Sequence, residues 1–172
     1  MEDARSFEQI ALEMMRDKEL RGAREAKSRM KWDARFLDMA VLVAGWSKDP
    51  STQTGAVIVR PDLTVASVGF NGFAKQMSDA PWLYEDRETK YSRIVHCEMN
   101  ALLSAGEFVE EDTLYTTGMC CDRCAVHLIQ AGITRFVWRE DSTDMKYRWR
   151  TSFDRTLAYF AEAGVETTEV PR

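Results

Sequence analysis

The sequence predicts a single α/β domain with five strands, some paired antiparallel and some parallel. Two apolar runs, at residues 55–60 and 64–70, are separated by a very short link, which indicates an antiparallel hairpin. From residue 96 onward, helical and strand patterns alternate, and strand–helix–strand repetition favours right-handed crossovers and parallel pairing. A length of 172 residues is enough for one domain with a sizeable core and is short for two.

The first residues differ in character from the rest of the chain. Residues 1–30 are densely charged, with apolar residues at helical spacing, and predict an N-terminal helical extension. A partly frayed charged segment is the alternative. Residues 31–172 form the predicted domain, which opens with a second helix near residues 33–46 because a wide apolar stripe begins at Phe36. Pro50 disfavours helical geometry in the residue before it, so this helix is expected to end there.

The later elements follow from the same periodicities. After the second strand comes a polar connection, residues 73–93, whose length is uncommon inside a compact domain and marks it as a candidate functional loop. Gly106 and Gly132 each close a predicted helix. The elements predicted beyond this connection are helix 96–105, strand 113–117, helix 121–131, strand 133–138, helix 148–163 and strand 165–170.

Composition argues against several classes of function. The formal net charge of −5 and the sequence pI near 5.2 disfavour a nucleic-acid partner, since non-specific contact with a polyanion needs a basic face. No apolar run approaches the ~20 residues of a membrane span, and the acidic start predicts no secretory signal. We therefore expect a cytoplasmic protein without a membrane partner, in which thiols stay reduced.

Two short motifs carry the chemistry. His96 and Glu98 lie two residues apart, and Cys121 and Cys124 have the C-x-x-C spacing. Each pair falls at the predicted start of a helix, where free amide hydrogens and a partial positive charge lower thiolate pKa values. One His and two Cys can hold a zinc ion and leave its fourth tetrahedral position to water, as in catalytic zinc sites. Glu98 is then a natural proton carrier beside that water.

The other thiols leave further interpretations open. Cys97 or Cys120 as a fourth protein ligand would make the zinc structural, but each is adjacent to a candidate ligand and would point away from it on a helix. A lone C-x-x-C is also typical of thioredoxin-like redox sites, which do not need the H-x-E motif found upstream here. His127, the only other histidine, is expected to be an ordinary helix residue.

A longer set of segments resembles a known family. The H-x-E and C-x-x-C pair is the signature of zinc deaminases. Further matches lie at residues 47–56, 68–72 and 89–91, and together they closely resemble deoxycytidylate (dCMP) deaminases over about residues 31–170. With this resemblance, the expected fold is a three-layer α/β/α sandwich around a mixed five-stranded sheet. The implied reaction is hydrolysis of dCMP to dUMP and ammonia, which supplies dUMP for thymidylate-type nucleotide synthesis.

The resemblance also implies roles in catalysis. His96, Cys121 and Cys124 would bind Zn²⁺, with water as the fourth ligand. Glu98 would take the proton of that water, deliver it to N3 of cytosine and then help to protonate the departing ammonia.

Matching positions likewise imply contacts with the substrate. Asn71 would contact the sugar, and Thr54 and Lys48 would flank the nucleotide. Lys48 is the candidate for binding the 5′-phosphate, with Lys90 and Arg93 as alternatives.

Two positions depart from the family pattern. Cys120 stands where the family usually has proline before the first cysteine ligand, so the turn into that helix is less constrained. Cys97 stands where the family usually has alanine and is a candidate contact to the pyrimidine, which bears on tolerance of a C5 substituent. Extra thiols beside the metal would also favour sensitivity to oxidation.

Family members assemble into homo-oligomers, often hexamers, and many are activated by dCTP and inhibited by dTTP. The resemblance therefore implies a homo-oligomer, and residues 73–93, with Asp79, Glu85 and Asp86, are the candidate regulatory segment. Two other classes of function stay open. One is a deaminase of another cytosine nucleotide, such as 5-substituted dCMP, of a nucleoside or of nucleic acid. The other is a non-catalytic module stabilised by zinc.

Overall fold

A computed structural model describes residues 7–106 and 108–171 of the chain, which divides into two compact units, residues 1–35 and 36–172. Helix α1 runs without interruption from Phe7 to Ala44. The sequence predicted two helices here, with a break near residue 31. Neither proline nor a pair of glycines occurs at that point, so nothing in the chain interrupts the hydrogen-bond ladder.

The second unit is built on a mixed five-stranded sheet with the order β2-β1-β5-β6-β7. Strand β1 pairs antiparallel with β2 and with β5, whereas β5–β6 and β6–β7 are parallel. The strands are β1 (Gly55–Val59), β2 (Val65–Phe70), β5 (Thr113–Thr116), β6 (Arg135–Arg139) and β7 (Glu166–Val170). The predicted hairpin, the parallel half of the sheet and the five strands are confirmed.

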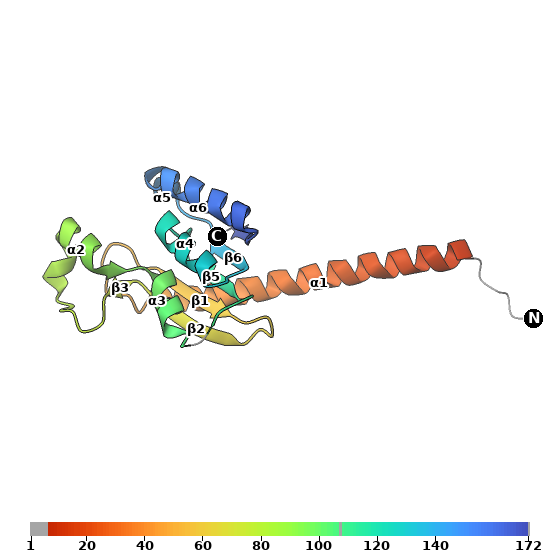
Figure 1. Cartoon of the computed structure of the whole chain (residues 1–172), viewed down its shortest axis with the longest axis horizontal. Coiled ribbons are helices and arrows are strands. Elements are labelled where there is room, and N and C mark those ends of the chain that lie inside the picture. The colour runs from red at the N-terminus through yellow and green to blue at the C-terminus, as the bar shows by residue number, and fades with distance from the viewer. Residues whose placement is uncertain (1–6, 107, 172) are drawn as a thin grey trace, which may run out of the picture. The chain divides into compact units, whose positions relative to one another are not determined.

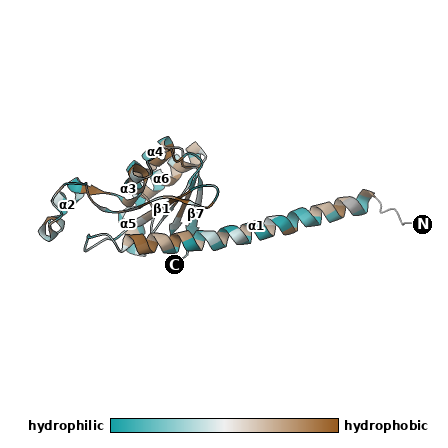
Figure 2. Cartoon of the chain, turned by 90° about the horizontal axis from the view of Figure 1, so that it is seen from below, coloured by the Kyte–Doolittle hydropathy of each residue, from teal (hydrophilic) through white to brown (hydrophobic). Residues whose placement is uncertain are grey.

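Helices cover both faces of this sheet (Figures 1 and 2). Gly69 of β2 lies against helix α3 (Cys97–Ser104), and Gly55 of β1 lies against the last turns of α1. Because Gly69 is opposite Ala56, the neighbour of Gly55, these two helices pack on opposite faces of the sheet. The three-layer prediction is confirmed.

The two faces have separate sets of buried side chains. Helices α3, α4 (Asp122–Gln130) and α6 (Arg150–Ala163) share one face, whose core includes Ala56, Ile58, Leu114, Ala125, Leu128, Phe136 and Phe160. Residues 36–44 of α1 cover the other face, where Phe36 packs against Tyr115 with ring centroids 5.1 Å apart. None of the helices in the described ranges combines the length and apolar composition of a membrane span.

The long connection after β2 is more ordered than the sequence indicated. Strand β3 (Gly72–Phe73) pairs antiparallel with β4 (Ile94–Val95), and between them lie a 3₁₀ turn (Pro81–Tyr84) and helix α2 (Arg87–Arg93). The carboxylate of Asp86 accepts a hydrogen bond from the Thr89 amide and caps α2, a local contact that the residue pattern permits.

A further helix that the sequence did not predict lies between β6 and α6. Helix α5 (Thr143–Arg148) precedes Trp149, whose backbone angles (φ −107°, ψ 12°) turn the chain before α6 begins. Ser142 caps α5 by accepting a hydrogen bond from the Met145 amide. The sequence predicted one helix in this region, and the structure has two that meet at a corner.

The close approach of β2 and α3 fixes the helix that carries half of the metal motif. A Cβ at Gly69 would lie 2.2 Å from the Ala101 nitrogen and 2.4 Å from the Cys97 carbonyl oxygen. Only a residue without a side chain fits between these two backbones.

Replacing Gly69 with alanine tests this packing. Both atoms that the new methyl group meets are backbone atoms, so β2 and α3 must separate. We expect the free energy of unfolding, measured by urea denaturation, to fall by about 3 kcal/mol or more. The control is Gly22→Ala in α1, where no atom outside the local helix backbone lies within 4 Å of the new Cβ. It should leave stability unchanged or raise it by up to about 1 kcal/mol. Equal stability of Gly69→Ala and the parent chain would contradict the close approach.

Candidate metal centre

Two helices of the same layer begin at the motif residues. His96 is the N-cap of α3 and Cys121 is the N-cap of α4, and both have extended backbone angles (φ −69°, ψ 155° and φ −75°, ψ 159°). The carbonyl of each accepts the first helical hydrogen bond, from Asn100 and Ala125 respectively. Neither side chain caps its own helix, so the imidazole and the thiol remain available to the site.

The donor atoms of His96, Cys121 and Cys124 all lie within 4.8 Å of one another. Nδ1 of His96 is 3.4 Å from the sulfur of Cys121 and 3.5 Å from that of Cys124. In a tetrahedral site with Zn–N of about 2.05 Å and Zn–S of about 2.3 Å, nitrogen and sulfur ligands lie about 3.6 Å apart. The spacing of the three donors therefore fits zinc, with Nδ1 as the histidine ligand.

The two cysteines hold their protons unequally. A hydrogen bond from Cys124, together with the nearby His96, lowers the pKa of the Cys121 thiol to about 4 although burial opposes this. The same hydrogen bond and burial raise the pKa of Cys124. The hydrogen bond with Cys121 also raises the pKa of His96 to about 9, against the effect of burial. Zinc binds thiolates and neutral imidazole, so metal binding at neutral pH must release the protons of Cys124 and His96.

Glu98 lies in the first turn of α3 with only 5% of its surface exposed. Its Oε2 atom is buried and forms no hydrogen bond with any described residue. Buried carboxylate oxygens are almost always hydrogen-bonded, so this atom is suited to a partner that enters the site. Burial raises the pKa of Glu98, and the charge of His96 opposes this only in part. The carboxylate therefore has an increased affinity for a proton.

The remaining cysteines do not extend the donor cluster. Within the described ranges, no fourth His, Cys, Asp or Glu joins the group of His96, Cys121 and Cys124. Cys97 and Cys120 are buried in the hydrophobic core between the helices and the sheet. The geometry thus disfavours the structural four-ligand alternative. His127 contacts the carbonyl of Arg123 at 2.7 Å, as expected for a residue outside the site.

A cavity of about 380 Å³ opens onto these residues. Its volume falls in the range of about 300–1,000 Å³ typical of small-molecule sites. Of the residues singled out from the sequence, Thr54, Asn71, Lys90, His96, Glu98 and Cys121 line it. Lys48, Arg93, Cys97 and the zinc donor Cys124 are not among its lining residues. Asp49 and Tyr91 also line it; they lie in segments that match the family pattern, but the sequence indicated no individual role for them. The other lining residues that the sequence did not single out include Met119, Met145, Arg148, Trp149 and Phe153.

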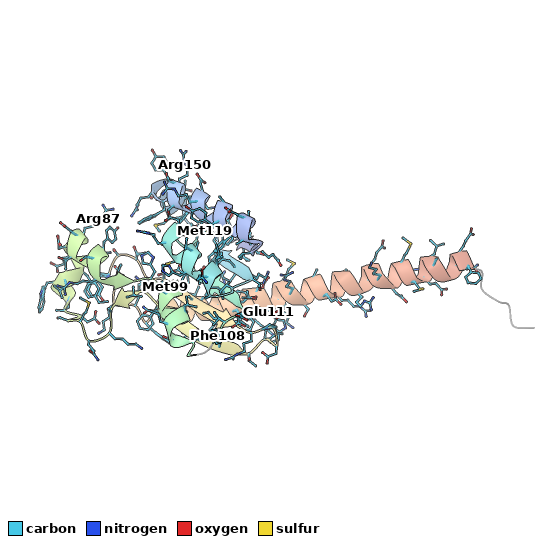
Figure 3. All side chains as sticks on the ribbon, viewed as in Figure 1. Arg87, Met99, Phe108, Glu111, Met119 and Arg150 are labelled. Carbon is cyan, nitrogen blue, oxygen red and sulfur yellow. The ribbon has the colours of Figure 1, made fainter. Side chains whose placement is uncertain are left out.

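A second cavity of about 650 Å³ adjoins the first and shares His96, Cys121, Arg148 and Trp149 with it. Met99 of α3 lines this larger cavity, whereas Met119, in the loop before α4, lines the smaller one (Figure 3). The donor cluster therefore lies at the boundary between the two cavities.

Comparison with known proteins decides the family. The family described as the cytidine and deoxycytidylate deaminase zinc-binding region matches residues 30–140. The chain belongs to this family. Its recognition from the short motifs is confirmed, and so is zinc as its cofactor.

Relatives of this deaminase come from distant organisms. It is 41% identical over 141 residues to an uncharacterized deaminase of the luxG 3′ region of Aliivibrio fischeri, which covers 82% of this chain and 95% of that protein. It is 35% identical over 118 residues to the deoxycytidylate deaminase of Mus musculus, covering 65% of this chain and 66% of the mouse protein.

A solved structure has the same fold. The dCMP deaminase of cyanophage S-TIM5, crystallised in complex with dCMP and dUMP, matches 80% of this chain and 95% of its own with a TM-score of 0.65. Sequence identity is 19%, so this likeness concerns the fold alone.

In this deaminase, hydrogen bonds of Asn71 hold the cavity wall formed by residues 52–54 in place. Its Oδ1 atom accepts a hydrogen bond from the Thr54 amide and its Nδ2 atom donates to the Thr52 carbonyl, each at 2.8 Å. The Asn71 amide in turn donates to the Thr54 carbonyl at 3.1 Å. Side chain and backbone together hold residues 52–54 against the end of β2.

A buried ion pair supports the same wall. Nζ of Lys90 lies 3.1 Å from Asp49 and 2.6 Å from Oγ of Ser51, and the side chains of Lys90 and Asp49 are only 10% and 3% exposed. Burial raises the pKa of Asp49, but hydrogen bonds from the Ser51 amide and from Lys90 outweigh it, so the net pKa is lowered. Lys48, by contrast, pairs with Asp79, which also accepts a hydrogen bond from Tyr84.

Side chains from outside the motif hold the loop that enters α4. The Asp141 carboxylate accepts a hydrogen bond from the Met119 amide at 2.8 Å, and Thr156 donates to the Cys120 carbonyl at 3.1 Å. Ser152 of α6 accepts a hydrogen bond from the Asp122 amide and donates to the Asp122 carboxylate. These anchors constrain the turn that proline constrains in the family pattern.

Removing the Asp141 anchor should loosen the metal loop. We expect Asp141→Ala to bind zinc about 10-fold more weakly, because the Met119 amide, two residues before Cys121, loses its acceptor. Competition with a chromophoric chelator measures this. Asp154→Ala removes an exposed carboxylate of α6 and serves as the control, which should bind zinc as the parent does. Unchanged affinity in Asp141→Ala would show that the loop does not need this anchor.

Proposed function

We propose that this chain hydrolyses dCMP to dUMP and ammonia with a single zinc ion. The observation that carries the proposal is the cluster of three donor atoms beside a cavity that is lined by two of the donors, His96 and Cys121, and by Glu98 with its unpartnered carboxylate oxygen. Support for the substrate comes from the mouse relative, a deoxycytidylate deaminase. The product would serve thymidylate-type nucleotide synthesis.

His96, Cys121 and Cys124 hold the metal in this proposal, through Nδ1 and two sulfurs. Zinc, when bound, supplies a Lewis acid that lowers the pKa of water toward neutrality. The positive ends of α3 and α4 also point into the site, since His96 and Cys121 cap these helices. They stabilise negative charge on the thiolates and on the attacking oxygen.

Glu98 moves the protons. Its carboxylate takes one proton from the attacking water and gives it to N3 of cytosine, which makes C4 more electrophilic. As the C4–N4 bond breaks, Glu98 returns the second proton of the water to the amino group, and ammonia leaves. The pKa of Glu98, raised by burial, suits a group that must both accept and release a proton.

The substrate lies against the wall formed by Thr54 and Asn71, which line the cavity with Glu98. Oδ1 of Asn71 is engaged with the Thr54 amide, but Nδ2 carries a second hydrogen that can be donated to the sugar. Cys97 lies one layer behind, in hydrogen-bond contact with the side chains of Thr54 and Glu98. In this proposal, Cys97 affects the recognition of the pyrimidine, and of a substituent at its C5 position, through its contacts with Thr54 and Glu98.

Several expectations stay predictions from the sequence. They are the division into residues 1–30 and 31–172, a cytoplasmic location, a homo-oligomer such as a hexamer, and regulation by dCTP and dTTP. Of the acidic residues in the candidate regulatory segment, Asp79 pairs with Lys48 and Asp86 caps α2. Both carboxylates thus have structural partners in this chain.

Metal content separates the proposed site from a structural one. We expect one zinc ion per chain by elemental analysis, because the donor cluster has three protein ligands. His96→Ala, Cys121→Ala and Cys124→Ala should each lose most of that zinc. Cys97→Ala and Cys120→Ala are the matched controls and should retain it, since both thiols lie in the core. Loss of zinc from either control would assign a fourth protein ligand.

Replacing the proton carrier should remove turnover without removing the metal. We expect Glu98→Gln to keep its zinc and to lose about 10²- to 10⁴-fold in kcat, because the amide cannot transfer protons. Ammonia release is measured from dCMP, CMP, deoxycytidine and 5-methyl-dCMP. Glu162→Gln changes an exposed residue of α6 and should behave as the parent chain. Full activity in Glu98→Gln would refute the mechanism, and no turnover of any substrate by the zinc-loaded parent would refute the dCMP proposal.

A further inference from the structure

Two of the lysines near the site have their charges compensated. Lys48 forms an ion pair with Asp79, and its pairing lowers the pKa of that carboxyl. Lys90 lines the cavity but is held by Asp49, which lines it as well, and by Ser51. A phosphate dianion in contact with Lys90 would also meet the Asp49 carboxylate, which lines the same cavity.

Arg148 differs from both lysines. It is the last residue of α5, it is exposed, and it lines both cavities. Within residues 7–106 and 108–171, no carboxylate forms an ion pair with it. Two other arginines line the larger cavity: Arg155 is paired with Asp122, and Arg123 does not line the smaller cavity that contains Glu98. Arg148 is therefore a cation without an acidic partner at the boundary of the two cavities.

Several of the side chains that line the smaller cavity with Arg148 are apolar. Met145, Trp149 and Phe153 line the smaller cavity beside it, and apolar walls strengthen the attraction between opposite charges. The planar guanidinium group donates two parallel hydrogen bonds to a phosphate, which a lysine cannot do. The corner at Trp149 ends α5 at Arg148, so the backbone itself places this side chain at the cavity.

We propose that Arg148 binds the 5′-phosphate of the substrate and makes the site prefer a nucleotide to a nucleoside. The inference rests on the proposed function, since it assigns a residue to the phosphate of dCMP. In this arrangement the α5–α6 corner supplies the nucleotide specificity, and the motif-bearing helices α3 and α4 supply the chemistry. Lys48 keeps a structural role through Asp79.

The test compares dCMP with deoxycytidine as substrates of the zinc-loaded full chain. We expect Arg148→Ala to raise the KM for dCMP about 10- to 100-fold, the range for one charge-assisted contact. Its kcat for dCMP and its kcat/KM for deoxycytidine should change less than about 3-fold. Arg148→Lys should recover part of the lost affinity, because it restores the charge without the planar geometry. Inorganic phosphate should inhibit the parent chain competitively and Arg148→Ala much less.

Arg150→Ala is the matched control. Arg150 begins α6, two residues away (Figure 3), and lines neither cavity, so its loss should leave both substrates unaffected. Binding of dUMP by calorimetry, with zinc content and thermal unfolding of each variant, separates lost affinity from lost folding. A parent chain that prefers dCMP, with an Arg148→Ala variant that keeps this preference, would overturn the inference alone. A parent chain that deaminates none of the substrates would overturn the proposed function and the inference with it.

Discussion

The structure depends on one geometric constraint, the meeting of two helix N-termini at a distance that suits a single zinc ion. His96 and Cys121 both cap their helices in an extended conformation, and their donor atoms lie 3.4 Å apart. A shift of 1 Å in either helix would spoil this spacing, because zinc ligand distances vary by only about 0.2 Å. The sheet fixes one helix through the glycine contact between β2 and α3. Polar contacts from Asp141 and α6 fix the loop that starts the other.

The wall of the smaller cavity near Thr54 and Asn71 is held by a different kind of interaction. Lys90 and Asp49 bury opposite charges across 41 residues of sequence, and Ser51 completes the hydrogen bonding. Loss of one partner of such a pair leaves an uncompensated buried charge, at a cost of about 3–5 kcal/mol. The pair contributes little net stability by comparison with apolar packing. Its main effect is to fix the positions of the two segments that it connects. It joins α2 to the loop at residues 49–52 and thereby closes the site on that side.

Local patterns in the sequence were sufficient for the sheet, its mixed pairing and the identity of the zinc donors. Short apolar runs bounded by turn residues predict strands, and the spacings of His96, Glu98, Cys121 and Cys124 correspond to the first turns of two helices. Contacts that depend on tertiary structure gave no such signal. The sequence predicted Arg148 only as the first residue of a helix, and the corner at Trp149, which places it at the cavity, is visible only in the structure. Likewise, the sequence placed Lys90 in a loop and offered it as an alternative phosphate ligand, and its buried pairing with Asp49 is visible only in the structure.

The anchors of the metal loop also bear on how the protein is made. All three zinc donors lie before residue 125, yet Asp141, Ser152 and Thr156, which hold their loop, come later in the chain. A nascent chain leaving the ribosome therefore presents its thiols before it can hold them in place, since synthesis proceeds from the N-terminus. During that interval Cys121 and Cys124 are open to competing metals and to oxidants. The set of contacts that holds this loop is complete only once α6 has been synthesised.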